Sequence, residues 1–451
     1  MRFVIIGGGP AGTEAATHAA RLGIEVVLVE RDVVGGAAHL RDCIPSKTMI
    51  ATGGALSSLT RMGGMGLSDV AAGLDVAALA ERIVAIEARL EVATTELLTR
   101  QGVELVRGTG RLDGTHAVVA QTDEGARRIE ADAVLLCTGS RPRVPDWATP
   151  DGVRVLTSRD AYPPPSLPEH LAVIGSGVTG VELVHMFNTL GSEVSLVVSR
   201  QHVLPHKDPE VAAALEEDFA ARGVRLLKGA RAVGIDTTAG GVRVRCDDGR
   251  VVDATHALLA VGSVPNTESL GLEHAGLRAD EGGYLAVNHH CQTAVPHIYA
   301  AGDVSGKLPL ASVATMQGRK IAEHVAIGHT VAHRHLNYDR AASAIFTEPE
   351  IADVGVAEAE AFAEGRKIRV TKVPFAANPK ALINNDPRGF VKIVSDPATG
   401  VVLGGSIVGA GAAELISVIA LAVTAELRVS DIVESMLVHP ALAEALAEAA
   451  E

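Results

Sequence analysis

The sequence predicts an α/β protein that contains two copies of one strand–turn–helix–strand unit. Three observations support this fold class. Hydrophobic residues make up 47% of the 451 residues but aromatic residues only 3%, so the core is expected to be aliphatic. Residues 4–12 and 173–180 both carry an apolar strand followed by a glycine-rich turn, and the similarity continues into the next helix and strand. A chain of this length usually forms more than one core, so we expect several domains.

The glycines of the two copies have the spacing of a dinucleotide-binding turn. The first glycine makes the tight turn, the second lets the backbone approach a pyrophosphate, and the third lets the helix pack closely on the strand. Glycine-rich turns without a ligand are the alternative, but two copies in the same setting favour nucleotide binding. The six glycines are Gly7, Gly9 and Gly12 in the first copy and Gly175, Gly177 and Gly180 in the second.

The two copies differ at the end of their second strand, where the ribose of a bound nucleotide would be recognised. Glu30 stands there in the first copy, and a carboxylate accepts hydrogen bonds from a ribose 2′-hydroxyl, which suits FAD. Val198 stands there in the second copy and cannot accept this bond. Ser199 and Arg200 follow, and a guanidinium pairs well with a 2′-phosphate. We therefore expect NADPH at the second copy, with NADH possible and a purely solvated role for Arg200 as the alternative.

Charge and hydropathy argue against several kinds of partner. The net charge is −14 and no block of basic residues occurs, so nucleic acid is not expected to bind. The N-terminus is typical of a first strand and not of a signal peptide. The most apolar late stretch, residues 415–425, is too short to span a bilayer. We expect a cytoplasmic protein without stable membrane insertion.

The cysteines are scattered and form neither a CxxC pair nor the Cys/His spacing of a metal site. In a reducing compartment they are expected to be thiols, and we expect no bound metal. They are Cys43, Cys137, Cys246 and Cys291.

Five further segments occur in the order found in one family. Together they resemble the pyridine nucleotide–disulfide oxidoreductases of the dihydrolipoamide dehydrogenase type, over nearly the whole chain. The segments are GGAAHLRDCIPSK (35–47), CTGSRP (137–142), VGSVPN (261–266), YAAGD (299–303) and HPALAE (439–444).

The resemblance implies two Rossmann-like domains, one for FAD and one for NAD(P), and a C-terminal α+β dimerisation domain with a βαβ-like pattern from Ala342 onward. The chain would act as a homodimer. The implied boundaries are residues 1–148 for the FAD domain, 149–265 for the NAD(P) domain, 266–335 for a central domain that completes the FAD site and 336–451 for the dimerisation domain.

The resemblance also assigns roles to residues around the FAD. Thr138 and Gly139 would close the FAD domain, and Asp303 would hold the ribityl chain. Gly262 would lie at the exit from the nicotinamide domain. Lys47 and Glu182 would form an ion pair beside the reactive nitrogen of the flavin, with an ordinary helix-end ion pair as the alternative.

His439 and Glu444 match the C-terminal motif of the family. His439 would approach the flavin of the partner subunit and donate a proton to the reduced acceptor, with Glu444 as its orienting base. The alternative is that His439 serves only the interface. Ala441 replaces a threonine of the family motif, which leaves the hydrogen bonding of this segment open.

The redox segment departs from the family pattern, because Ala38 stands where the first cysteine of CxxxxC is expected. Thiol–disulfide exchange needs an attacking thiolate and a second sulfur, and this segment supplies Cys43 alone. Cys43 is either a thiolate lowered in pKa by a helix that Pro45 predicts to begin there, or a thiol with a packing role. Asp42, which replaces a glycine, would instead raise the thiol pKa.

The leading hypothesis is an FAD-dependent NAD(P)H:quinone oxidoreductase, because hydride transfer from nicotinamide to flavin needs no cysteine. A similar segment with one cysteine occurs in the quinone reductases of this group. Two alternatives remain: a single-cysteine NAD(P)H peroxidase or oxidase that uses Cys43, and a non-catalytic nucleotide-binding redox sensor. A disulfide reductase that uses Cys137, Cys246 or Cys291 as a substitute is the remotest possibility.

Overall fold

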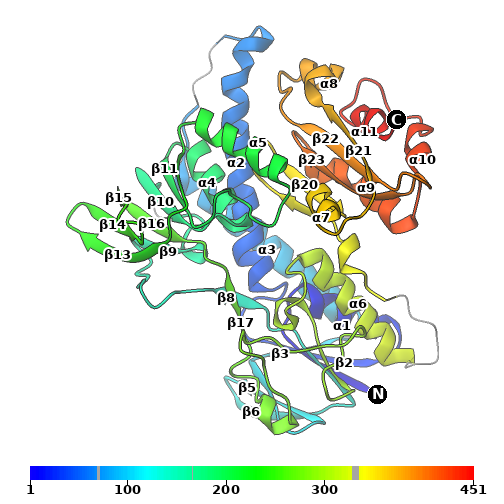
Figure 1. Cartoon of the computed structure of the whole chain (residues 1–451). Coiled ribbons are helices and arrows are strands. Elements are labelled where there is room, and N and C mark those ends of the chain that lie inside the picture. Colours follow the sequence, from blue (N-terminus) through cyan, green and yellow to red (C-terminus); the bar gives the residue numbers. More distant parts are fainter. Residues whose placement is uncertain (69–71, 165, 328–334) are drawn as a thin grey trace. The chain divides into compact units, whose positions relative to one another are not determined.

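The structure, a computed structural model, describes residues 1–68, 72–164, 166–327 and 335–451. It divides into two compact units whose segments alternate along the chain, and each is described by itself. Unit 1 comprises residues 1–45, 77–143 and 263–338, and unit 2 comprises residues 46–76, 144–262 and 339–451. Figure 1 labels the helices and strands.

Unit 1 is built on a five-stranded parallel sheet in the order β18-β7-β1-β2-β3. Its strands are short, and all except the edge strand β3 are almost wholly buried, as expected for a parallel sheet covered on both faces. The strands are β1 (Arg2–Ile6), β2 (Glu25–Glu30), β3 (Glu104–Arg107), β7 (Ala133–Leu136) and β18 (Ile298–Ala300). An antiparallel sheet of β4 (Thr109–Leu112), β5 (Ala117–Thr122) and β6 (Gly125–Glu130) and a ribbon of β8 (Ser140–Pro142) with β17 (Ser263–Pro265) complete its strands.

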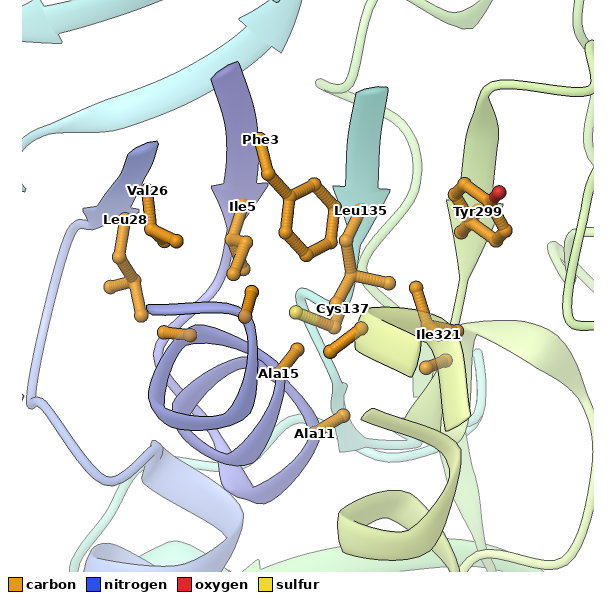
Figure 2. Packing of buried hydrophobic residues seen from close by; sticks show 14 of the residues in the cluster. Phe3, Ile5, Ala11, Ala15, Val26, Leu28, Leu135, Cys137, Tyr299 and Ile321 are labelled. Atoms are coloured by element: carbon orange, nitrogen blue, oxygen red, sulfur yellow. The ribbon is translucent and has the colours of Figure 1, made fainter. Parts of the chain in front are cut away.

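Helices cover one face of the unit 1 sheet. Side chains of alternate strand residues, such as Phe3 and Ile5, point to this face and pack against small residues of α1 and against Ile321 of α6, as Figure 2 shows. The next residues along β1, Val4 and Ile6, point to the opposite face, where they pack against the β4–β6 sheet. The helices of this unit are α1 (Pro10–Arg21), α3 (Val76–Arg100) and α6 (Ala311–Ile327).

Unit 2 contains a second five-stranded parallel sheet in the order β12-β11-β10-β16-β9. Its strands are β9 (Val155–Thr157), β10 (His170–Ile174), β11 (Glu193–Val198), β12 (Arg225–Lys228) and β16 (His256–Leu259), with helices α2 (Ile44–Arg61), α4 (Val178–Thr189) and α5 (Pro209–Ala221) in the same unit. A three-stranded antiparallel sheet joins its core: β13 (Ala232–Thr238), β14 (Gly241–Cys246) and β15 (Val251–Ala254).

The C-terminal part of unit 2 is a five-stranded antiparallel sheet in the order β19-β20-β23-β22-β21. The helix α9 packs on β20 and β23. The strands are β19 (Ser343–Ile345), β20 (Ile351–Gly355), β21 (Arg369–Pro374), β22 (Phe390–Ser395) and β23 (Val402–Val408), and the helices are α7 (Glu358–Ala363), α8 (Pro379–Ile383), α9 (Ala412–Ala425), α10 (Val429–Val433) and α11 (Glu444–Ala450).

The predicted α/β class with two nucleotide-type parallel sheets is confirmed. The βαβ-like pattern expected from Ala342 onward is wrong in its strand direction, because β20 and β21 are not neighbours and every pair in that sheet is antiparallel. The four domain boundaries stay predictions. Among the described residues, no helix is both long and apolar enough to cross a bilayer.

Candidate nucleotide sites and redox segment

The first glycine-rich turn joins β1 to α1 in a conformation that only glycine tolerates. Gly7 has φ +112°, and a Cβ there would lie 2.4 Å from the carbonyl oxygen of Cys137. A Cβ on Gly12 would lie 2.0 Å from the carbonyl oxygen of Gly7, so the start of α1 lies directly on the turn. Gly9 caps α1 without any side-chain hydrogen bond.

The second turn, between β10 and α4, repeats this geometry. Gly175 also has φ +112°, and a Cβ there would lie 2.2 Å from the carbonyl oxygen of Ala260. A Cβ on Gly180 would lie 1.8 Å from the carbonyl oxygen of Gly175. Gly177 caps α4 with the same φ and ψ as Gly9 in the first copy, and a Cβ there would meet no atom within 4 Å.

Both turns suit a pyrophosphate. The first N–H groups of a helix lack intrahelical partners and attract anions, and neither α1 nor α4 has a side chain that takes this place. The open space over Gly177 lets a phosphate approach the backbone. The residues present therefore fit the nucleotides that the sequence predicts.

The ends of the second strands also lie where they were expected. The Glu30 carboxylate, at the end of β2, accepts hydrogen bonds from the N–H groups of Gly8 at 2.5 Å and Asp32 at 2.7 Å. These bonds fix the carboxylate beside the turn, and a carboxylate has further lone pairs for a ribose hydroxyl. In the second copy Val198 is buried, whereas Ser199 and Arg200 are exposed beyond β11.

Unit 1 gathers the other residues expected at the FAD. The Thr138 hydroxyl donates to the Asn266 carbonyl at 2.7 Å, and the Asn266 amide donates to the Thr138 carbonyl at 3.0 Å. The Ser140 hydroxyl donates to the Asp303 carboxylate at 2.5 Å. Gly139 has φ +67° and lies beside open space.

Three residues that support this part of unit 1 were not predicted from the sequence: Ser140, Asn266 and Gln317. Ser140 and Asn266 lie inside the CTGSRP and VGSVPN segments, so these segments could have identified them. Gln317 lies buried in α6 and accepts the N–H of Gly302 at 2.7 Å, which fixes the start of the Asp303 segment. No motif marks it.

Lys47 and Glu182 form an ion pair within unit 2, with 2.7 Å between Nζ and Oε2. Glu182 lies on α4 and is buried, and its other oxygen accepts the N–H of Phe346 at 2.9 Å. The ammonium of Lys47 also lies 4.9 Å from the centre of the Phe346 ring. The carboxylate is thus held from two sides, and it fixes the position of the ammonium group.

The redox segment forms a π-helical turn, Ala38–Cys43, that leads directly into α2. The N–H of Ile44 donates to the carbonyl of His39. The α-helix begins where Pro45 predicts, and the π-helical turn precedes it without a break, so Cys43 does not stand at an open helix N-terminus. The two roles expected for Cys43, a reactive thiolate or a packing thiol, stay predictions.

Cys43 is half-exposed, and the other three cysteines are buried. Burial raises the pKa of the thiols of Cys137, Cys246 and Cys291, for Cys291 to about 11. The thiolate is the reactive form in disulfide exchange. These three thiols are poorly suited to replace the missing sulfur at Ala38.

His439 and Glu444 contact each other as the motif predicts, with 2.7 Å between Nδ1 and Oε1. The other carboxylate oxygen accepts the N–H of Ala441 at 2.8 Å. The backbone thus supplies a hydrogen bond inside the motif although Ala441 has no hydroxyl. These two hydrogen bonds lower the pKa of Glu444, and the bond from the Ala441 N–H has the larger effect. The imidazole of His439 is 71% exposed.

Comparison with known proteins agrees with this geometry. The family model described as "Pyridine nucleotide-disulphide oxidoreductase" matches residues 1–318, and the model of the dimerisation domain of the same family matches residues 341–450. The chain belongs to the pyridine nucleotide-disulphide oxidoreductase family. Oxidoreductases of this family use FAD and NAD(P)H.

Three relatives show how far the likeness extends. A Mycobacterium tuberculosis protein named NAD(P)H dehydrogenase (quinone) is 43% identical, covering 100% of this chain and 93% of the relative. The crystal structure of LpdA from Mycobacterium tuberculosis has a TM-score of 0.94 and 42% identity, covering 100% of this chain and 99% of that one. The dihydrolipoyl dehydrogenase of Zymomonas mobilis is 34% identical, covering 99% of this chain and 96% of the relative.

Within this oxidoreductase family the chain is therefore similar both to a protein named NAD(P)H dehydrogenase (quinone) and to proteins named dihydrolipoyl dehydrogenase.

Proposed function

We propose that this protein is an FAD-dependent NAD(P)H:quinone oxidoreductase that transfers a hydride from the nicotinamide and delivers two electrons to a quinone or a similar soluble acceptor. One observation carries the proposal: the redox segment holds a single sulfur, that of Cys43, because Ala38 stands at the position of the first cysteine of the family pattern. The buried state of the other three thiols and the relative named as a quinone dehydrogenase support it.

When bound, FAD accepts the hydride of NADPH or NADH and passes two electrons to the acceptor. The chain supplies the surroundings. Lys47, fixed by the buried Glu182 at 2.7 Å, would place a positive charge beside the flavin and favour negative charge there. Gly9 would let the pyrophosphate approach the backbone, whereas Gly7 and Gly12 let the turn and α1 pack closely.

The acceptor becomes a hydroquinone when two electrons and two protons reach it. His439 is the proposed proton donor, and the Glu444 carboxylate at Nδ1 would fix the ring so that Nε2 faces the acceptor. Met436, Val438 and His439 are all exposed in the single chain. We propose that a second copy covers this segment in a homodimer, which would complete each site.

The direct test is a steady-state screen of purified, flavin-loaded protein. NADPH and NADH are each combined with benzoquinone, naphthoquinone, lipoamide, glutathione disulfide and peroxide. We expect turnover with quinones and none above background with the disulfides. Efficient lipoamide or glutathione disulfide reduction would overturn the proposal.

The nicotinamide preference has its own test. Replacing Arg200 by leucine removes the group proposed to pair with the 2′-phosphate. The KM for NADPH should rise by about tenfold or more, the loss of one charge-assisted contact, whereas the KM for NADH should stay within about twofold. An equal effect on both nucleotides would assign Arg200 to the solvated surface.

A further inference from the structure

Three histidines outside the nucleotide sites converge on the surface of unit 1. His289 and His290 lie in one turn, and His335 lies downstream of α6. One ring nitrogen from each lies within 4.8 Å of those from the other two. The ring centre of His289 lies 4.1 Å from that of His290 and 4.4 Å from that of His335. His289 and His335 are exposed and His290 is half-buried, so a small solute can reach all three.

The turn that carries His289 and His290 is fixed by Asn288. The side-chain oxygen of Asn288 accepts the N–H groups of His290 at 2.9 Å and Gln292 at 3.0 Å. Its amide group donates to the side chain of Gln292 at 3.0 Å. The turn therefore keeps its shape without any ligand.

The segment that carries His335 is tied to the same turn. The side chain of Tyr338 lies beside that of Cys291, which directly follows His290. The amide group of Gln317 also donates to the Tyr338 hydroxyl at 3.0 Å. Tyr338 thus holds the backbone near His335 close to the turn.

A second layer of groups supports His290. The ring of His324, on α6, stacks on that of His290 with 4.6 Å between centres and 9° between planes. Nδ1 of His324 lies 2.8 Å from the hydroxyl of Tyr299. Tyr299 itself stands in the unit 1 core, as Figure 2 shows. Because His324 is buried and tied to Tyr299, its ring forms a fixed surface against which the His290 imidazole packs.

We propose that His289, His290 and His335 bind one divalent transition-metal ion of the class that prefers imidazole, namely Zn²⁺, Cu²⁺ or Ni²⁺. Hard ions such as Mg²⁺ and Ca²⁺ prefer oxygen ligands, which these side chains do not supply. Zinc–imidazole bonds are about 2.0–2.1 Å long, so the three nitrogens must draw closer. The two exposed rings can do this by side-chain rotation, and water can complete the coordination.

The bound ion would join the 288–292 turn to the segment after α6. A ligand that binds only the folded chain stabilises it by mass action, so Zn²⁺ should raise the thermal midpoint of the protein. The sequence predicted no metal, because that expectation was argued from Cys/His spacing along the chain.

The test is isothermal titration of tag-free, flavin-loaded protein with zinc sulfate. We expect one Zn²⁺ per chain. His289→Ala and His335→Ala should each weaken binding by at least about tenfold, because losing a residue that only supports a metal ligand already costs about that much, and losing a ligand should cost no less. His274→Ala is the matched control, because it removes another exposed imidazole of unit 1, and it should bind as the wild type does. Magnesium sulfate should give no binding heat.

Absence of Zn²⁺ binding by the wild type would overturn the proposal, as would unchanged affinity in both His289→Ala and His335→Ala. Crystals grown with zinc give a second measurement. We expect an anomalous peak between the three imidazoles. A zinc ion at another position, with none between these imidazoles, would contradict the assignment. Equal flavin content in all variants verifies that they are folded.

Discussion

At the scale of single residues, the Lys47–Glu182 pair connects burial with the proposed chemistry. Glu182 is buried on α4, and burying a carboxylate costs free energy unless it has hydrogen-bonding partners. It has two, the Lys47 ammonium and the Phe346 N–H. We propose that this pair supplies the positive charge that the family resemblance expects beside the flavin.

Replacing Lys47 by methionine tests this role. Turnover with NADPH and naphthoquinone should fall by about 10- to 100-fold, because a preorganised charge that stabilises the reaction is lost. Lys372→Met is the control, since Lys372 also pairs with a glutamate of unit 2, Glu210, but lies on β21 of the C-terminal sheet. The control should keep its turnover number. Equal turnover in the two variants would contradict the role of Lys47.

His185 gives a prediction about pH. Burial, followed by the charge of Arg222, lowers the pKa of His185 to about 3, well below the ordinary value near 6.5 in an unfolded chain. The folded state therefore binds fewer protons than the unfolded state between these values. The free energy of unfolding should fall as the pH drops below about 6.5, by about 2 kcal/mol at pH 5 from this residue alone.

Urea unfolding of the wild type and of His185→Gln between pH 7.5 and pH 5 tests this prediction. The variant lacks the titrating ring and should show a shallower loss of stability. Thr189→Val removes a hydroxyl that lies 3.2 Å from the same ring but keeps the imidazole, so it should retain the wild-type slope. Parallel curves for the wild type and His185→Gln would show that His185 does not carry the effect.

At the scale of elements, the two glycine-rich turns are the part that the sequence predicted best. The glycine spacing predicts that the third glycine of each turn packs against the carbonyl oxygen of the first. The structure has both contacts, Gly12 on Gly7 and Gly180 on Gly175. The π-helical turn at Ala38–Cys43 was missed, because its hydrogen bonds leave no periodic signal in so short a stretch.

Other elements could not be predicted because their partners are distant in sequence. The order of the C-terminal sheet depends on which strands pair, and apolar patterns alone do not encode this order. The cluster of His289, His290 and His335 joins residues that are 45 positions apart in the sequence, so spacing along the chain does not reveal it. In contrast, the Lys47–Glu182 and His439–Glu444 contacts were expected, since whole motifs carried them.

Alanine at the third glycine of each turn should separate the two nucleotide sites. A Cβ on Gly12 or Gly180 would overlap a backbone carbonyl of its own turn, so the helix must shift. Gly12→Ala should purify with less flavin. Gly180→Ala should keep its flavin but bind NADPH at least about tenfold more weakly, roughly 1.4 kcal/mol.

Gly54→Ala is the control for this pair. It lies on α2 with no atom within 4 Å of the added Cβ, so it should leave both nucleotides bound and stabilise the helix by up to about 1 kcal/mol. The ratio of flavin to protein absorbance and a titration with NADPH give the readouts. Normal flavin content in Gly12→Ala would contradict the assignment of the first turn to FAD.

At the scale of the whole molecule, the chain combines two nucleotide-type parallel sheets with the dimerisation domain of its family. This framework is shared by relatives named for different reactions. The redox segment of this chain carries Ala38 and Cys43, and therefore a single sulfur. The central claim is that electrons leave the flavin without passing through a thiol.

The most direct test compares flavin-loaded wild type with Cys43→Ser, with NADPH as donor and naphthoquinone or lipoamide as acceptor. We expect Cys43→Ser to reduce naphthoquinone within about twofold of the wild-type rate, because the cofactors carry the chemistry, and neither protein to reduce lipoamide. A loss of quinone turnover by more than about tenfold in Cys43→Ser, or lipoamide reduction by the wild type, would contradict the central claim.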